Sequence, residues 1–237
     1  MTHICLLLSG AALLINGLGT LGAVPRRDAA VLSLVIGSVQ LLLGITYLAV
    51  SYPDSPGRDS DGGWQLLLSG SGVFLFGLTY AYVGLDFLLA LGSKGLGWFS
   101  GMVAGCGLML AAAWSNSDPL LAVLWLCWSY LWTLFFFSLA LGRSRLSPLI
   151  GWSLVLASQT TTTVPALLGM TGQWPLDPGT AAGAAVCLVL LLLLAGGLAR
   201  RDGRRNLGHA AVAPNGQLDP DRQLDPNEQL ETTASAG

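Results

Sequence analysis

Charged residues are scarce in this sequence, and histidine is almost absent. Of the 237 residues only 10% are charged, while 53% are hydrophobic, and the net charge is −2. The two histidines, His3 and His209, lie close to the ends of the chain. Such a composition predicts an integral membrane protein and gives no reason to expect a nucleic-acid partner.

The long apolar segments also lack the groups that most membrane chemistry requires. They contain no Lys, Arg, Glu or His, and Asp86 at the end of one segment is their single candidate carboxylate. Proton-coupled carriers place titratable groups near the bilayer midplane. Gly70-Ser71-Gly72 offers a serine, but no histidine is available to activate it. The four cysteines form no CxxC pair, so they give no sign of a metal site. Taken together, these absences lead us to expect no enzyme, no cofactor and no metal site.

Seven apolar segments are long enough to cross a bilayer as helices. They are expected at about residues 4–24, 29–51, 64–85, 96–114, 119–141, 148–170 and 180–199. The predicted fold is an all-α polytopic membrane bundle, with a six-helix core in residues 1–170 and a seventh transmembrane helix in 171–199. Residues 200–237, which repeat a Gln-Leu-Asp-Pro unit, are predicted to be a disordered tail because their apolar content is low.

The basic residues determine the expected orientation. If the N-terminus lies outside, the inner side receives Arg26, Arg27, Lys94, Arg143, Arg145 and the basic start of the tail, and the outer loops receive Arg58 alone. An excess of Lys and Arg on the cytoplasmic side is the usual bias in membrane proteins. The sequence therefore predicts an external N-terminus and a cytoplasmic tail.

A tryptophan-rich stretch from Leu120 to Trp132 is the most distinctive part of the chain. On a helix, Trp125, Trp128 and Trp132 recur at i, i+3 and i+7 and share one face. Tryptophan usually lies at the membrane interface, whereas these three extend into the span. They indicate either aromatic filling between packed helices or one wall of a passage.

Polar or aromatic groups on other segments are expected at the same depth, roughly 14 to 24 Å into the span. Counting along each helix places Asn16, Phe76 to Tyr80, and Ser158 to Gln159 at the level of Trp128 to Trp132. A passage lined in this way could not solvate an ion, but it could admit a small, flat, neutral amide. Packed helices without a passage remain the alternative. The threonine run before Pro165 predicts a local kink in the sixth segment.

Four motifs resemble the AmiS/UreI family in their order and spacing. They are Leu14-Ile15-Asn16-Gly17 followed by Leu21-Gly22, then Phe76-Gly77-Leu78-Thr79-Tyr80-Ala81-Tyr82, Gly95-Leu96-Gly97-Trp98-Phe99-Ser100 and Trp125-Leu126-Cys127-Trp128-Ser129-Tyr130-Leu131-Trp132. The resemblance covers about residues 1 to 170. It implies a channel for urea and short aliphatic amides in a bacterial plasma membrane. It also implies a homo-hexamer in which each protomer has its own pore, and functional coupling to a cytoplasmic amidase or urease.

The resemblance further implies which residues line the pathway. Leu13, Phe76, Tyr80, Trp128, Leu131 and Trp132 match constriction positions, and Asn16, Thr79 and Trp125 match positions at or beside the passage.

The chain departs from the family pattern in its sixth segment and its outer loops. The family's well-studied urea channel carries a pore glutamate in the sixth helix, where this chain reads Ala157-Ser158-Gln159. The outer loops contain no histidine, so we expect a channel without acid gating. A non-conducting anchor or sensory partner that acts through its tail is the alternative function.

Overall fold

The computed structural model describes residues 2–51 and 63–211, with side chains described as far as Asp202. The described residues are almost entirely helical, as the sequence predicted, and no strand occurs among them. Contacts within the chain separate the unit Met1–Asp202, which is described below, from residues 203–237.

Eight α-helices and three short turns of other helix types follow one another along the described chain. The long helices are α1 (Thr2–Thr20), α2 (Arg26–Ser51), α3 (Gly63–Leu89), α4 (Lys94–Trp114) and α5 (Pro119–Phe135). They are followed by α6 (Ser147–Ser158), α7 (Val164–Met170) and α8 (Pro178–Ala211). The turns are the π-helical η1 (Phe136–Ala140), the 3-10 turn η2 (Ser144–Leu146) and the π-helical η3 (Gln159–Thr163).

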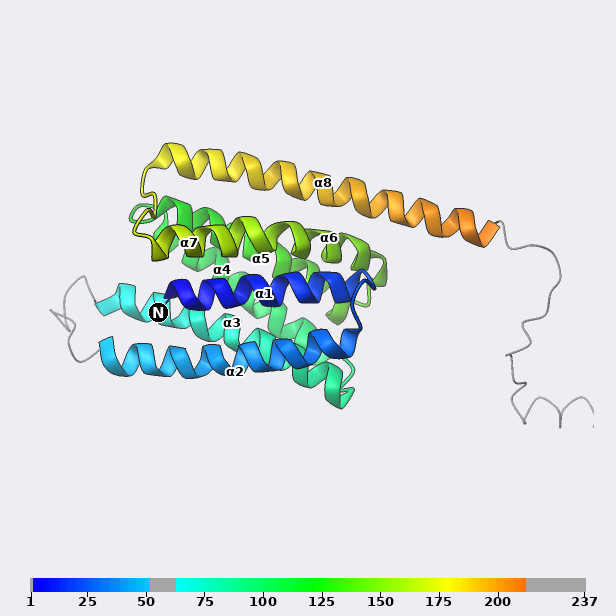
Figure 1. Ribbon diagram of the computed structural model, residues 1–237, viewed down its shortest axis with the longest axis horizontal. Helices are drawn as coiled ribbons and strands as arrows, with labels where there is room; N and C mark the ends of the chain where they lie inside the picture. Colours follow the sequence, from blue (N-terminus) through cyan, green and yellow to red (C-terminus); the bar gives the residue numbers. More distant parts are fainter. Residues whose placement is uncertain (1, 52–62, 212–237) are drawn as a thin grey trace, which may run out of the picture. The chain divides into compact units, whose positions relative to one another are not determined.

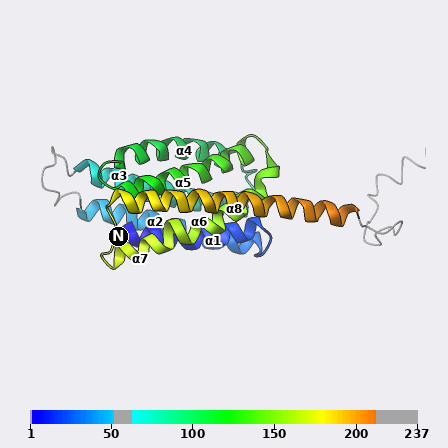
Figure 2. The ribbon, with the colours of Figure 1, turned by 90° about the horizontal axis from the view of Figure 1, so that it is seen from above.

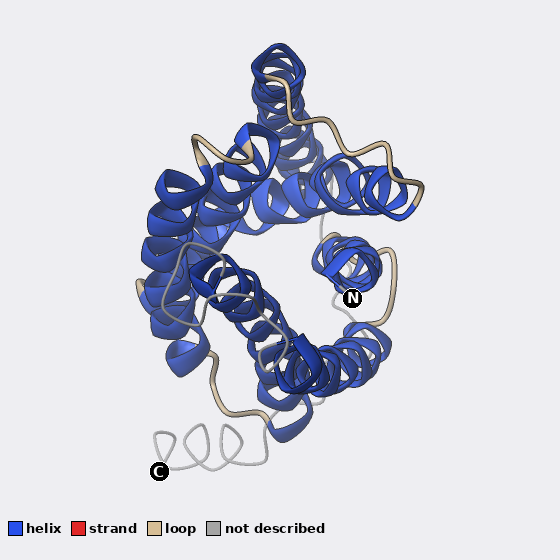
Figure 3. Cartoon of the chain, turned by 90° about the vertical axis from the view of Figure 1, so that its left-hand side faces the viewer, coloured by secondary structure: helices blue, strands red, loops and turns tan. Residues whose placement is uncertain are grey.

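The helices of the first unit lie side by side with their axes roughly aligned (Figures 1 and 2). A view toward one end of the bundle shows α1 to α7 grouped together, with the part of α8 up to Asp202 on the outside (Figure 3). Among the described residues, six helices are long and apolar enough to cross a membrane. The predicted sixth span is the continuous run of α6, η3 and α7 from Ser147 to Met170. The all-helical polytopic fold predicted from the sequence is confirmed.

The sixth span widens into a π-helical turn at the predicted kink. All four threonine hydroxyls of Thr160–Thr163 donate to carbonyl groups three to five residues earlier, as in Thr161 Oγ1 to Ala157 O at 2.7 Å. Hydroxyls that bond the backbone in this way compete with regular helical hydrogen bonds. Pro165 follows in the first turn of α7 and has no backbone N–H to donate. The local sequence therefore accounts for the break.

Glycine allows α2 and α3 to approach each other closely. A Cβ atom added at Gly37 would lie 2.7 Å from the carbonyl oxygen of Gly77 and 2.9 Å from Cα of Ala81. On α4, Gly97 and Gly101 face η1, whereas Gly105 has nothing within 4 Å. Small residues that bring backbones together are the usual basis of helix association in lipid.

The seventh predicted span, α8, packs loosely. Only 17% of its most apolar window is buried, against 39–56% in the other five spanning helices. Its contacting face repeats at intervals of three and four residues, through Ala181, Ala184, Leu188, Leu191 and Ala195. Further along α8, Asp202 accepts a hydrogen bond from the Nε1–H of Trp152 on α6 at 2.7 Å.

The boundary predicted between this span and the tail is displaced. The sequence predicted a disordered tail from residue 200, whereas α8 continues to Ala211. Arginine is a good helix former, so the basic segment extends the helix. The rest of the predicted tail, 212–237, lies outside the described residues.

The contact between α2 and α3 leads to a stability prediction. Gly37→Ala should lower the free energy of unfolding by about 1–3 kcal/mol, because its methyl group overlaps the α3 backbone. Gly105→Ala is the matched control, since a Cβ atom at Gly105 would have nothing within 4 Å. It should be neutral or slightly stabilising, because alanine has a higher helix propensity than glycine. Thermal unfolding of both variants in detergent, followed by far-UV circular dichroism, tests this, and equal midpoints would contradict it.

Candidate functional site

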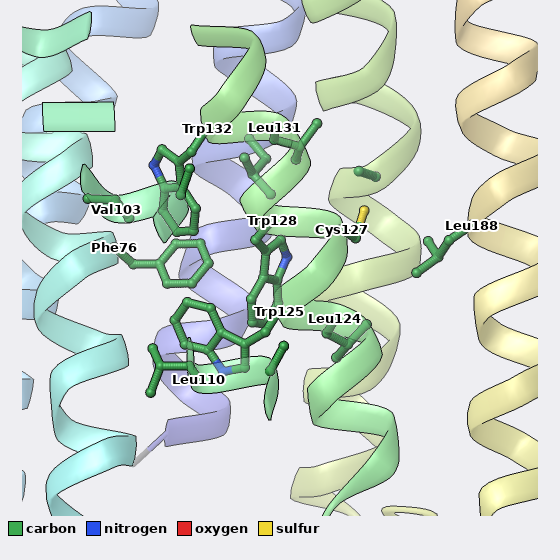
Figure 4. Packing of buried hydrophobic residues seen from close by; sticks show 14 of the residues in the cluster. Phe76, Val103, Leu110, Leu124, Trp125, Cys127, Trp128, Leu131, Trp132 and Leu188 are labelled. Atoms are coloured by element: carbon green, nitrogen blue, oxygen red, sulfur yellow. The ribbon is translucent and has the colours of Figure 1, made fainter. Parts of the chain in front are cut away.

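Phe76 of α3 lies among three indole rings of α5. Its ring centroid is 4.9 Å from that of Trp128, 4.8 Å from that of Trp132 and 5.9 Å from that of Trp125 (Figure 4). Trp128 meets Phe76 edge to face at 90°, and Trp125 meets Trp128 at 85°. These are preferred aromatic geometries, so the four rings form one interlocked group. We call them the ring cluster.

The ring cluster lies between two cavities. One, the Arg26 cavity, has a volume of about 180 Å³ and is lined by residues of α1 to α6, including Arg26. The other, the His3 cavity, has a volume of about 390 Å³ and includes His3 near the start of α1. Phe76 and Trp128 line both cavities, so these two rings are their shared boundary.

All nine residues predicted as pathway residues line at least one of the two cavities. The Arg26 cavity includes Leu13, Asn16, Phe76, Thr79, Tyr80, Trp128, Leu131 and Trp132. Trp125 lines the His3 cavity. Eight of the nine side chains are no more than 7% exposed, and Asn16 is half-buried. The structure thus brings together residues that the sequence distributes over three helices.

Hydrogen bonds fix the polar members of this group. Trp128 donates its Nε1–H to Thr161 Oγ1 at 3.1 Å, and the Tyr80 hydroxyl donates to the carbonyl of Ser9 at 3.4 Å. Asn16 uses its amide hydrogens on Ser33 Oγ at 2.7 Å and Ala12 O at 2.8 Å. An amide with both hydrogens committed can offer a solute only its carbonyl oxygen.

Ser158 and Gln159, which the sequence placed at the depth of the tryptophans, line neither of these two cavities, and Gln159 is exposed. The polar contact to the ring cluster comes instead from Thr161, inside the π-helical turn. A π-helical turn changes the angular position of the residues around it, so counting along an ideal helix could not identify this one.

Two carboxylates at the cavities were not among the predicted site residues. Asp86 lines the Arg26 cavity and accepts hydrogen bonds from the backbone N–H of Ser93, at 2.9 Å, and from its hydroxyl. These bonds support the α3–α4 turn, where Ala90 and Ser93 have positive φ. Asp118 lines the His3 cavity and caps α5 by accepting from Leu121 N at 2.9 Å. An Asp before a proline at the start of an apolar run is a recognisable capping signal.

The walls of both cavities suit the recognition of neutral molecules. They are mostly rings and aliphatic side chains with a few hydroxyl, amide and indole groups, and the Arg, Asp and His residues among them are Arg26, Asp86, Asp118 and His3. In the part of the chain that the structure describes, no group of His, Cys, Asp and Glu is arranged to hold a metal ion.

Comparison with known proteins agrees with this description. The model of the AmiS/UreI family transporters matches residues 1–173. A putative transporter protein AmiS2 of Rhodococcus erythropolis is 44% identical over 198 residues, covering 82% of this chain and 91% of the relative. A putative amidate substrates transporter protein of Mycolicibacterium smegmatis is 34% identical over 194 residues, covering 81% of this chain and 87% of the relative.

Two solved structures share the fold. The crystal structure of the urea channel from Helicobacter pylori matches with a TM-score of 0.62 at 22% identity. The match covers 74% of this chain and 100% of the channel's chain. The closed-state structure of the Helicobacter pylori urea channel gives a TM-score of 0.63 at 23% identity, with the same coverage. The family match extends over most of the chain and includes every residue of the ring cluster. The protein is therefore a multi-pass membrane transporter that belongs to the AmiS/UreI family.

Proposed function

We propose that the protein is a passive channel for urea or short-chain aliphatic amides, which cross the membrane past the ring cluster. The observation that carries this proposal is the shared boundary of the two cavities, made by Phe76 and Trp128. A solute that moves from one cavity to the other must displace or slide along these rings.

The chemistry of the boundary favours flat neutral solutes. An ion that enters would lose its hydration shell and gain almost no compensating ligands, which costs many kcal/mol. An amide can lie against an indole face and form a few hydrogen bonds. In this proposal Leu13, Phe76, Leu131 and Trp132 set the width, while Trp128, Tyr80, Asn16 and Thr79 offer faces and polar contacts.

The names of the relatives support a transported solute of this class. One relative is described as a transporter of amidate substrates, and the matched solved structures are of a urea channel. No comparison favours the non-conducting anchor or sensory partner, because the matched relatives are transporters. Urea and short amides share a planar amide group that the site suits, so we propose this class of solutes and not a single member of it.

The membrane setting is also part of the proposal. Arg26, Arg27, Lys94, Arg143 and Arg145 lie in the turns and helix starts at one end of the bundle. The positive-inside bias then makes that end cytoplasmic and the N-terminus external. A bacterial plasma membrane, a homo-hexamer and functional coupling to a cytoplasmic amidase or urease remain predictions from the family resemblance.

Solute flux through proteoliposomes tests the function. Wild-type protein should speed the stopped-flow reswelling of vesicles in urea, formamide or acetamide relative to protein-free vesicles. Trp132→Ala should widen the passage at the ring cluster and raise the permeability to glycerol relative to formamide by about ten-fold, the lower end of discrimination by a shaped pocket. Leu126→Ala is the control, because Leu126 is on the same helix but 52% exposed. Unchanged permeability to every solute in Trp132→Ala would refute the role of the ring cluster.

Acidification should have little effect on flux. Histidine is the side chain that normally titrates between pH 5 and 8. His3 is the only histidine lining either cavity, and its Nδ1 is buried without a hydrogen-bond partner. We expect acetamide permeability at pH 5 to stay within about two-fold of that at pH 7, measured in vesicles with equal pH on both sides. A steep change in permeability between these pH values would contradict this expectation. If that pH dependence then disappeared in His3→Phe, the His3 side chain would be its cause.

A further inference from the structure

Trp174 lies in the segment that joins α7 to α8, immediately after residue 173, where the family match ends. It lines the His3 cavity, together with Trp114, Asp118 and Trp125. A tryptophan in a connecting segment follows no helical periodicity, so neither the sequence pattern nor the family match gives it a role.

Two contacts hold the Trp174 ring in place. Its Nε1–H donates to Asp118 Oδ2 at 2.9 Å, and its ring centroid is 5.5 Å from that of His3. The other oxygen of Asp118 accepts from Leu121 N at the start of α5. Because α5 also carries the tryptophans of the ring cluster, Asp118 fixes the Trp174 indole relative to that cluster.

The start of α8 fixes the other side of the segment. Asp177 accepts from the backbone N–H and the hydroxyl of Thr180, both at 2.7 Å, which caps the helix. These hydrogen bonds hold the pKa of the Asp177 carboxyl below its usual value, so the cap persists into mildly acidic solution. Ala181 in the next turn is buried. The segment that carries Trp174 is thus held at its α8 end by this cap.

We propose that Trp174 is a specificity-determining residue at the outer mouth of the channel, where its indole limits the acyl-chain length of amides that reach the ring cluster. The proposal rests on the proposed channel function and adds a second selective surface to it. A planar carboxamide fits here, because the indole and the His3 ring offer flat faces while Asp118 keeps the indole N–H away from the solute. A branched or longer acyl chain needs more width beside this fixed indole than a planar carboxamide does.

The matched control for this proposal is Trp152. Like Trp174 it donates its Nε1–H to an aspartate, Asp202, and so attaches α8 to the bundle. Trp152 lines neither cavity and lies on α6, well away in sequence from the α7–α8 segment. Its replacement loosens α8 without changing the wall of the His3 cavity.

The test is the ratio of butyramide to formamide permeability in proteoliposomes that hold the full chain. Trp174→Ala should raise this ratio about ten-fold, and Trp174→Phe, which keeps most of the ring, should raise it less. Trp152→Ala should leave the ratio at the wild-type value. An unchanged ratio in Trp174→Ala, with formamide flux still above protein-free vesicles, would overturn this proposal and leave the channel function intact. An equal rise in Trp152→Ala would also overturn it, since displacement of α8 would then be the cause.

The two proposals fail in different ways. If wild-type protein passes neither amide faster than protein-free vesicles, the channel function itself is refuted, and the role of Trp174 falls with it.

Discussion

The contact between the Phe76 ring and the three indoles of α5 is the feature on which the rest of the site depends. It joins α3 to α5 and separates the two cavities. Aromatic rings suit this position because they close a narrow space without charge and present flat faces to a solute. In lipid, where apolar side chains gain little from leaving the solvent, such packing also contributes directly to helix association.

The surrounding helices are arranged so that this contact can form. Gly37 lets α2 approach α3, which carries Phe76, and the π-helical turn in the sixth span directs Thr161 toward Trp128. Asp118 begins α5 and bonds Trp174. An irregular turn of the backbone therefore supplies the polar partner of Trp128, while regular helix supplies the four rings of the ring cluster.

The sequence predicted the regular part of this arrangement. Hydrophobic length gave the spans, and the spacing of Trp125, Trp128 and Trp132 gave a shared face, because both follow from helix geometry. The lining residues taken from the family resemblance lie at the two cavities, and their role in conduction stays a prediction.

The irregular part escaped prediction for physical reasons. Four consecutive threonines bond back to the backbone and widen the helix, so Thr161 replaces Ser158 and Gln159 at the ring cluster. Trp174 belongs to a connecting segment whose path depends on distant contacts with Asp118 and His3. Where α8 ends depends on the helix propensity of its arginines, which a hydropathy count does not consider.

We propose that the boundary of rings passes neutral amides and rejects ions. The most direct measurement pairs acetamide flux in proteoliposomes with potassium and chloride conductance of the same preparation in planar bilayers. We expect acetamide permeability well above that of protein-free vesicles together with no ionic conductance. A steady ionic conductance that accompanies the amide flux would contradict it.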